Sequence, residues 1–227
     1  MVSDNTKRAS FSSKFRRERI RLFCEMIVQN KLSEIKMLDI GGRINYWEMN
    51  LQYFPKGLIT QIDIINLPPQ EKKEIEIDGT IITSYEGNAL DMSSFRLPYY
   101  DVIHSNSVIE HVGNLSAQYK LASIIPTLGS NFWIQTPAKS FPLEPHFYFP
   151  FFAYLPITMR AYLLRNFNMG FHLREENWLQ SRIICEETRL LNRKEFSFLF
   201  PSGEILTEKV LGLTKSYIAT NLNTAIP

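Results

Sequence analysis

The stretch KMLDIGGR, Lys36 to Arg43, decides the fold. Met37, Leu38 and Ile40 are apolar, and two glycines follow them directly. A short apolar run of this kind is typical of a strand that is buried on both faces of a sheet. Consecutive glycines lack Cβ atoms, so they permit a tight turn at which a ligand can approach the backbone. The stretch therefore predicts a buried strand leading into a binding loop, although Gly-Gly turns also occur for purely steric reasons.

Similar short apolar runs continue along the chain. Strands are predicted over residues 58–65, 100–105 and 131–135, with weaker signals over 74–82 and 81–85 around the turn Asp78-Gly79. Helices are predicted over 12–30, 115–128 and 193–200, the last beginning with a capping box of Asn192 and Glu195. Buried strands that alternate with helices indicate a parallel sheet covered on both faces.

The last two strand-like runs, 204–210 and 214–220, are separated by only three residues. This connection is too short for a helical crossover, so the two strands must form an antiparallel hairpin. Between the earlier strands and this hairpin, residues 139–182 break the alternation and are rich in proline and aromatic residues. We interpret this segment as an insertion carried by the sheet.

An acidic residue, Asp63, lies near the end of the second predicted strand, about 20 residues after the glycines. A carboxylate at the carboxyl end of a strand can accept hydrogen bonds from both hydroxyls of a ribose. The alternative is an aspartate that caps a helix or a turn. The spacing of Asp63 from Gly41 and Gly42 favours the ribose-binding role over the capping role.

The segment YDVIHSNSVIEHV, residues 100–112, adds the most specific pattern. With LDIGG (38–42), Asp63 and Gly87-Asn88-Ala89, it resembles the motifs of class I S-adenosylmethionine-dependent methyltransferases, in particular the small-molecule enzymes with a type 11 methyltransferase domain. The resemblance covers about residues 35–138 and resumes at the terminal hairpin. It implies a Rossmann-like, doubly wound α/β fold with a mostly parallel seven-stranded sheet that ends in an antiparallel hairpin.

The resemblance also implies the cofactor S-adenosylmethionine and a set of residues that bind it. Each part of the cofactor has its own segment: Asp39, Gly41 and Gly42 for the methionine end, Asp63 and Ile64 for the ribose, Asn88 and Ala89 for the adenine, and Ser105 and Asn106 for the floor of the site.

The chain departs from the family pattern at two places. Arg43 and Asn45 occupy positions where the family has further glycines, so a bulkier loop must clear the methionine part of the cofactor. Asn88 replaces the common aspartate, and its amide oxygen can still accept a hydrogen bond from the adenine amino group. No GxGxxG is present, which argues against NAD. Because these glycines are missing, an alternative stays open: the chain is a non-catalytic module that binds S-adenosylmethionine or a nucleotide.

Methyl transfer from a sulfonium requires alignment and exclusion of water, and a hydroxyl acceptor also requires removal of its proton. Two histidines are candidates for that step: His111, which follows Glu110, and His146, which follows Glu144 and Pro145. The alternatives are that His111 only lines the cofactor pocket and that Glu144 and His146 form a solvated turn. His104 lies within a strand and is expected to be a core residue.

The insertion over 139–182 admits three interpretations. It is extra core under a long loop, a lid that makes an apolar pocket for the acceptor, or a surface that rests on a membrane interface beside the basic N-terminal helix. Its uncharged run Phe147–Met159 is shorter than the roughly 20 residues that a spanning helix needs. No transmembrane segment is therefore expected, and peripheral contact stays open.

The bulk properties fit one domain over residues 1–227: an N-terminal helix (12–30), a cofactor-binding core (35–138 and 183–222) and a lid (139–182). The net charge of +2 gives no reason to expect nucleic acid. Cys24 and Cys185 show no metal-ligand spacing, so we expect no metal and a cytoplasmic location. The predicted function is methyl transfer to a small molecule, first the O-methylation of a sugar or secondary metabolite, with a peripheral membrane enzyme acting on a lipid as an alternative. The oligomeric state stays open.

Overall fold

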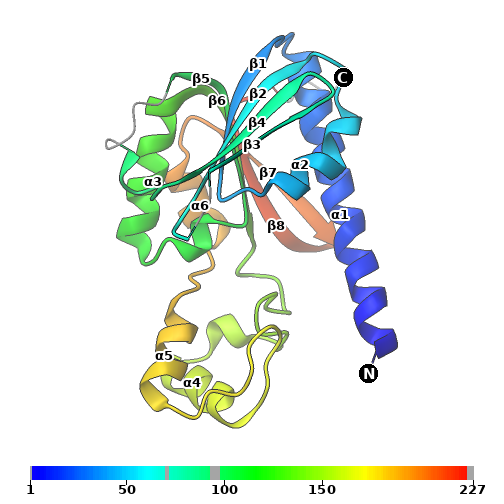
Figure 1. Ribbon diagram of the computed structural model, residues 1–227. Coiled ribbons are helices and arrows are strands. Elements are labelled where there is room, and N and C mark those ends of the chain that lie inside the picture. Colours follow the sequence, from blue (N-terminus) through cyan, green and yellow to red (C-terminus); the bar gives the residue numbers. More distant parts are fainter. Residues whose placement is uncertain (1, 70–71, 93–97, 224–227) are drawn as a thin grey trace.

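The computed structural model describes residues 2–69, 72–92 and 98–223, and their strands form a single sheet (Figure 1). The sheet has eight strands in the order β3-β4-β2-β1-β5-β6-β8-β7. Their bounds are Ile35–Ile40 (β1), Ile59–Asn66 (β2), Lys73–Ile77 (β3), Thr80–Glu86 (β4), Tyr100–Asn106 (β5), Gly129–Pro137 (β6), Glu204–Val210 (β7) and Leu213–Thr220 (β8). The central strands β4, β2, β1, β5 and β6 are parallel, whereas β3, at one edge, and β8 run antiparallel to their neighbours. The Rossmann-like fold with a terminal hairpin is thus confirmed.

The number of strands was predicted wrongly as seven. The weak signals over 74–82 and 81–85 are two paired strands, β3 and β4, which form an antiparallel hairpin at the edge of the sheet. Asp78 and Gly79 join them with φ of 51° and 86°, and two positive values of φ are typical of the tight turns that connect hairpins. The turn itself was predicted from Asp78 and Gly79, whereas the number seven followed from the family resemblance.

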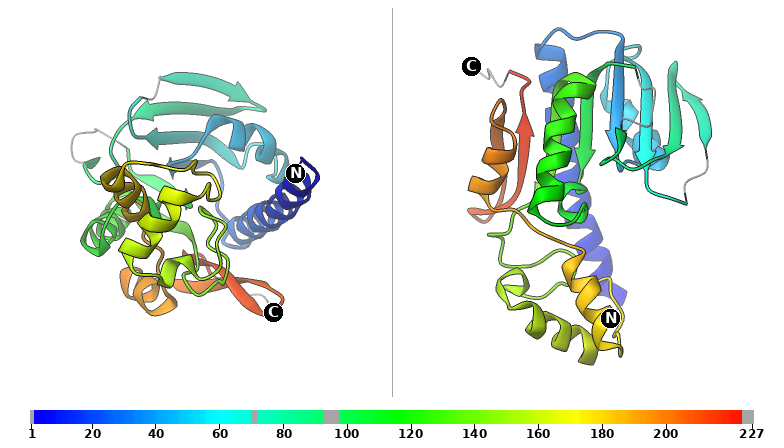
Figure 2. Two further views of the ribbon diagram at one scale, coloured as in Figure 1. Left: turned by 90° about the horizontal axis from the view of Figure 1, so that it is seen from below. Right: turned by 90° about the vertical axis from the view of Figure 1, so that its left-hand side faces the viewer.

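Helices cover both faces of the sheet, as Figure 2 shows. Their bounds are Val2–Gln29 (α1), Ile44–Asn50 (α2), Leu115–Leu128 (α3), Ile157–Asn166 (α4), Trp178–Glu186 (α5) and Arg193–Leu199 (α6), with short 3-10 turns at Leu51–Tyr53 (η1), Ile109–His111 (η3) and Phe152–Tyr154 (η4). The predicted capping box of α6 is present. Helix α1 begins ten residues before its predicted start, because its polar first turns lack the apolar spacing on which the prediction rested. None of the described helices is long and apolar enough to cross a membrane.

Two apolar layers hold the helices on the sheet. On one face, Phe23 and Ile27 of α1 pack with Trp47 of α2 and with Trp133 and Ile218 of the sheet. On the other face, Leu121 and Ile125 of α3 and Phe196 of α6 pack with buried apolar side chains of β1, β5, β6 and β8. All of these side chains are buried, so both faces of the sheet contribute to the hydrophobic stabilisation of the fold.

Between β6 and α6 the chain forms a separate lobe, residues 138–192, that projects from the sheet (Figure 1). The lobe contains α4, α5 and η4 and has its own apolar cluster of Phe147, Phe152, Leu164, Met169 and Cys185. Because Cys185 packs in this cluster, α5 belongs to the lobe as a whole. The apolar packing of the lobe therefore extends beyond residue 182, the predicted end of the insertion.

Arg19 of α1 links the helix to two strands. Its guanidinium donates to both carboxylate oxygens of Glu208 at 2.9 and 2.6 Å and to Oδ1 of Asn106 at 2.8 Å. The Arg19 and Glu208 side chains are only 8% and 12% exposed. The pair therefore fixes α1 across β7 and the carboxyl end of β5.

We expect Arg19→Ala to lower the free energy of unfolding by about 3 kcal/mol, because it leaves the largely buried Glu208 carboxylate without its partner. Denaturant unfolding measures the change. Lys14→Ala, which removes the exposed pair of Lys14 with Glu18, is the control and should change stability by less than about 0.5 kcal/mol. Equal effects of the two substitutions would contradict a structural role for Arg19.

Candidate functional site

A cavity of about 820 Å³ lies at the carboxyl ends of four parallel strands. Strand β1 pairs with β2 on one side and with β5 on the other, so the order of strands reverses at β1. Open α/β sheets bind ligands at this point, outside the carboxyl ends of the strands. The lining consists mainly of the segments at the ends of β1, β2, β4 and β5. Its residues are 40–45, 64–67, 87–90, 107–108 and 111–112, together with Glu48, Lys73 and Ser84.

Gly41 and Gly42 form the lip of this cavity after β1. Gly41 has a φ of 74°, and a Cβ atom there would lie 2.3 Å from Val108. A Cβ atom on Gly42 would lie 1.7 Å from Oδ2 of Asp39. Both positions therefore require glycine for steric reasons, and the same absence of side chains leaves the backbone open to the cavity.

Asp39 does not line the cavity but lies buried below the glycine loop. Its Oδ2 accepts a hydrogen bond from Nε1 of Trp47, and its Oδ1 lies 2.7 Å from Nδ1 of His104. The structure thus gives Asp39 a supporting position below the loop, outside the cavity lining. His104 is a buried core residue, as expected from its position within a strand.

Asp63, which was expected near the carboxyl end of its strand, lies three residues before that end. Strand β2 continues to Asn66, and Asp63 is buried within it, where it accepts hydrogen bonds from the Tyr100 hydroxyl at 2.7 Å and from Gln61. Asn66 instead ends the strand, lines the cavity and donates to the carbonyl of Gly42 at 2.6 Å. The sequence contained this signal, since Asn66 is the first polar residue after the apolar run.

Of the other expected cofactor residues, Ile64, Asn88 and Ala89 line the cavity, whereas Ser105 and Asn106 do not. The Ser105 hydroxyl donates to the carbonyl of Ile40, and Asn106 accepts from Arg19. Both polar groups join elements of the fold, which accounts for their position away from the cavity. The amide oxygen of Asn88 accepts from the backbone of Leu90 and so shapes the turn after β4.

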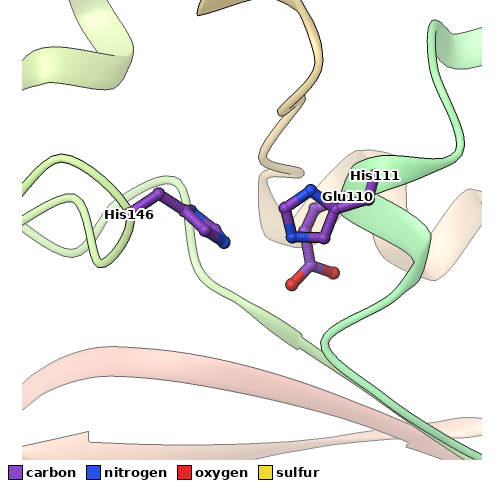
Figure 3. A group of neighbouring side chains, drawn as sticks. All are labelled: Glu110, His111 and His146. Carbon is purple, nitrogen blue, oxygen red and sulfur yellow. The ribbon is translucent and has the colours of Figure 1, made fainter. Parts of the chain in front are cut away.

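Three polar side chains from two separate parts of the sequence meet at the edge of the cavity: Glu110, His111 and His146, called here the polar cluster (Figure 3). One donor atom of each lies within 4.8 Å of the others. Glu110 and His111 belong to η3, just after β5, and His146 comes from the lobe. His111 also lines the cavity. The structure thus brings together the two candidate histidines, and adds Glu110, which sequence reasoning had treated only as a neighbour of His111.

Glu110 is fully buried. Its Oε2 accepts from the Thr136 hydroxyl at 3.0 Å, while Oε1 has no hydrogen-bond partner among the described residues. Burial raises the pKa of Glu110 to about 7, although a hydrogen bond with its own backbone N–H, the nearby His146 and the Thr136 hydroxyl act in the opposite direction. A buried acceptor atom without a partner is uncommon in folded proteins and calls for an explanation.

Glu144 fixes the orientation of His146. One carboxylate oxygen accepts from the backbone N–H groups of His146 and Phe147, and the other lies 2.6 Å from Nδ1 of His146. An ionised carboxylate only accepts, so Nδ1 carries a proton and Nε2 is left for the polar cluster. Burial lowers the pKa of His146, but the hydrogen bond and the charge of Glu144 outweigh it, so the pKa is raised overall. Partial burial and nearby His146 lower the pKa of His111 to about 4.

Comparisons with known proteins identify the fold. No protein-family model matches the sequence, and no curated protein matches it. The structure is similar to a cyclopropane-fatty-acyl-phospholipid synthase-like protein from Lactobacillus casei, with a TM-score of 0.53, 9% identity, and coverage of 90% of this chain and 89% of that one. It is also similar to magnesium protoporphyrin IX methyltransferase from Synechocystis, solved with SAH, with a TM-score of 0.52, 9% identity, and coverage of 90% and 82%.

A third similar structure is the N-terminal domain of EvdMO1 with SAH, at a TM-score of 0.51, 15% identity, and coverage of 89% and 79%. The chain spans only 55% of PigF and 56% of an O-methyltransferase family protein from Burkholderia thailandensis, two further matches. At these identities the likeness concerns the fold. The chain has the Rossmann-like fold of class I methyltransferases.

We expect Gly42→Ala to lower the free energy of unfolding by about 1–3 kcal/mol, because the new methyl group would overlap the buried Asp39 carboxylate. Denaturant unfolding measures this cost. Gly212→Ala, in the turn between β7 and β8, is the control: its φ is 81° but nothing lies within 4 Å of the added Cβ atom. It should cost only the backbone strain, about 1 kcal/mol. A Gly42→Ala variant as stable as the wild type would contradict the tight contact with Asp39.

Proposed function

We propose that this chain binds S-adenosylmethionine in the cavity and transfers its methyl group to a small-molecule acceptor, in the first place to a hydroxyl group. The observation that carries the proposal is the cavity itself, which lies at the carboxyl ends of the parallel strands with the polar cluster at its edge. Its volume of about 820 Å³ is in the range of cofactor sites. The fold, shared with methyltransferases solved with SAH, supports the same cofactor.

In this proposal each part of the cofactor meets a different strand end. The loop at Gly41 and Gly42 takes the methionine part, Asn66 takes the ribose hydroxyls, and Asn88 with Ala89 borders the adenine. Asp39 acts indirectly, because it holds Trp47 and His104 below the loop. The role expected for Asp63 passes to Asn66, which is the polar residue that the structure places at the end of β2.

The polar cluster lies on the acceptor side, after β5 and next to the lobe. The methyl carbon moves in line from sulfur to the acceptor oxygen, and the acceptor must lose its proton. We assign His111 and His146, the latter held by Glu144, to the handling of that proton. The lobe supplies apolar walls for the acceptor. The surface of the lobe also exposes large apolar side chains, namely those of Phe151, Tyr162, Phe167, Phe171, Leu173 and Leu179. An acceptor held at a lipid interface is therefore the second candidate.

Asn66→Ala should weaken the binding of S-adenosylmethionine and S-adenosylhomocysteine about 10- to 100-fold, as expected for the loss of hydrogen bonds to both ribose hydroxyls. Titration calorimetry measures the affinities. Asp63→Asn is the matched comparison, because Asp63 is a polar residue of the same strand that lies off the cavity. It should change the affinity less than threefold when its circular dichroism spectrum matches the wild type. The reverse order of effects would restore Asp63 as the ribose ligand, and no binding by the wild type would defeat the proposal.

His146→Ala should lower methyl transfer about 100-fold or more, while the affinity for the cofactor stays within twofold. Transfer is measured with radiolabelled S-adenosylmethionine on a panel of sugars, phenolic metabolites and lipids in vesicles. The control is Glu176→Gln, a substitution in the same lobe of an exposed carboxylate that lies outside the polar cluster. Cofactor binding without transfer to any acceptor would favour a non-catalytic module.

A further inference from the structure

The polar cluster has the composition of a metal site. We propose that Glu110, His111 and His146 bind a divalent first-row transition-metal ion, for which Zn²⁺ is the probe. Two imidazoles and one carboxylate form a ligand set that suits Zn²⁺ or Fe²⁺ and that leaves coordination positions open. Among the residues that the structure describes, this is the only group of three such side chains with donor atoms close together.

Glu110 provides the first argument. Its carboxyl group is wholly buried, yet Oε1 has no partner in the described part of the chain. The other oxygen, Oε2, is held by the Thr136 hydroxyl, so the side chain has a fixed orientation. A bound cation at Oε1 supplies the missing interaction and removes the cost of burying an unpaired acceptor.

The histidines provide the second argument. Nδ1 of His146 donates to Glu144, an arrangement that leaves Nε2 with its lone pair directed away from Glu144. Metal-binding histidines characteristically donate their other ring nitrogen to a carboxylate in this manner. Nδ1 of His111 lies 3.4 Å from the Thr188 hydroxyl, so this imidazole also has a partner at the nitrogen remote from the cluster. Figure 3 shows the three side chains turned toward one another.

The distances between the donor atoms of the polar cluster fit a site whose side chains move slightly closer together when an ion binds. The donor atoms lie within 4.8 Å of one another, whereas ligands about 2.0–2.1 Å from a tetrahedral ion lie roughly 3.3 Å apart. Rotation of the exposed His111 side chain and a small shift of the loop that carries His146 bring the donors to that spacing. Glu110 stays in place because it is enclosed.

The inference rests on the proposed function for its chemical role. An ion at the cluster takes the acceptor hydroxyl into an open position and lowers the pKa of that hydroxyl. The O–H bond breaks and its proton leaves to solvent. The oxygen then forms a bond to the methyl carbon, and the carbon–sulfur bond breaks with its electron pair moving to sulfur. The products are the methyl ether, S-adenosylhomocysteine and one proton. His111 and His146 thus serve removal of the proton through the ion that they hold.

Metal binding tests the proposal without any activity measurement. The full chain, stripped with EDTA and dialysed, is titrated with Zn²⁺ in a calorimeter, and with Co²⁺ to record the visible absorption of a coordinated ion. We expect one ion per chain. His111→Asn should weaken binding at least 100-fold; because His111 is exposed, this variant keeps the fold. Glu144→Gln, which changes the partner of the His146 ring and an acceptor of two backbone N–H groups in the same loop, should weaken binding about 10- to 100-fold.

The matched control is Glu176→Gln, which changes an exposed carboxylate of the lobe outside the cluster and should bind Zn²⁺ as the wild type does. Sub-stoichiometric binding by the wild type, or equal affinity of the wild type and His111→Asn, would overturn the proposal. Binding of S-adenosylmethionine in EDTA is measured in parallel. If the chain binds the cofactor but no metal ion, only the metal site is contradicted. If it binds the metal ion but no cofactor, the proposed function is contradicted and the metal site stands.

Discussion

The buried carboxylate of Asp39 joins the parts of the fold that surround the cavity. Each of its oxygens has one partner at 2.7 Å: Nε1 of Trp47 in α2 and Nδ1 of His104 in β5. The carboxylate also fills the space that a side chain on Gly42 would need. One group therefore fixes the end of β1, the helix that follows it and the neighbouring strand. The loop at the lip of the cavity takes its shape from this arrangement.

The two sides of the candidate site have different physical origins. The cofactor side consists of strand ends and loops of one sheet, so hydrogen bonds of the sheet and the packing of both faces determine its geometry. The acceptor side combines η3 with a lobe that has a separate apolar cluster. Sheet packing alone does not position His146, which depends on Glu144 and on the packing of the lobe.

The sequence predicted the features that depend on local pattern. Apolar runs located β1, β2, β5 and β6, the capping box located α6, and a three-residue gap identified the terminal hairpin. Other features depend on tertiary packing. Asp63 is buried inside the sheet, where it accepts from the Tyr100 hydroxyl, and α5 packs with the lobe through Cys185, whose packing no local pattern reveals. The meeting of Glu110 with His146 depends on the path of the lobe and has no signal in the sequence.

The lobe's apolar cluster has a consequence for alignment. Phe147, the residue after His146, stacks on Phe152 with ring centroids 4.2 Å apart and also lies against His172. Because protein interiors are close-packed, a change of one methylene in this stack shifts the backbone that carries the imidazole. Hydrophobic side chains of the lobe thus determine the position of the His146 imidazole by packing alone. Substitutions in the apolar cluster of the lobe can therefore change the position of His146, and with it the choice of acceptor. The sheet that forms the opposite side of the site stays unaltered.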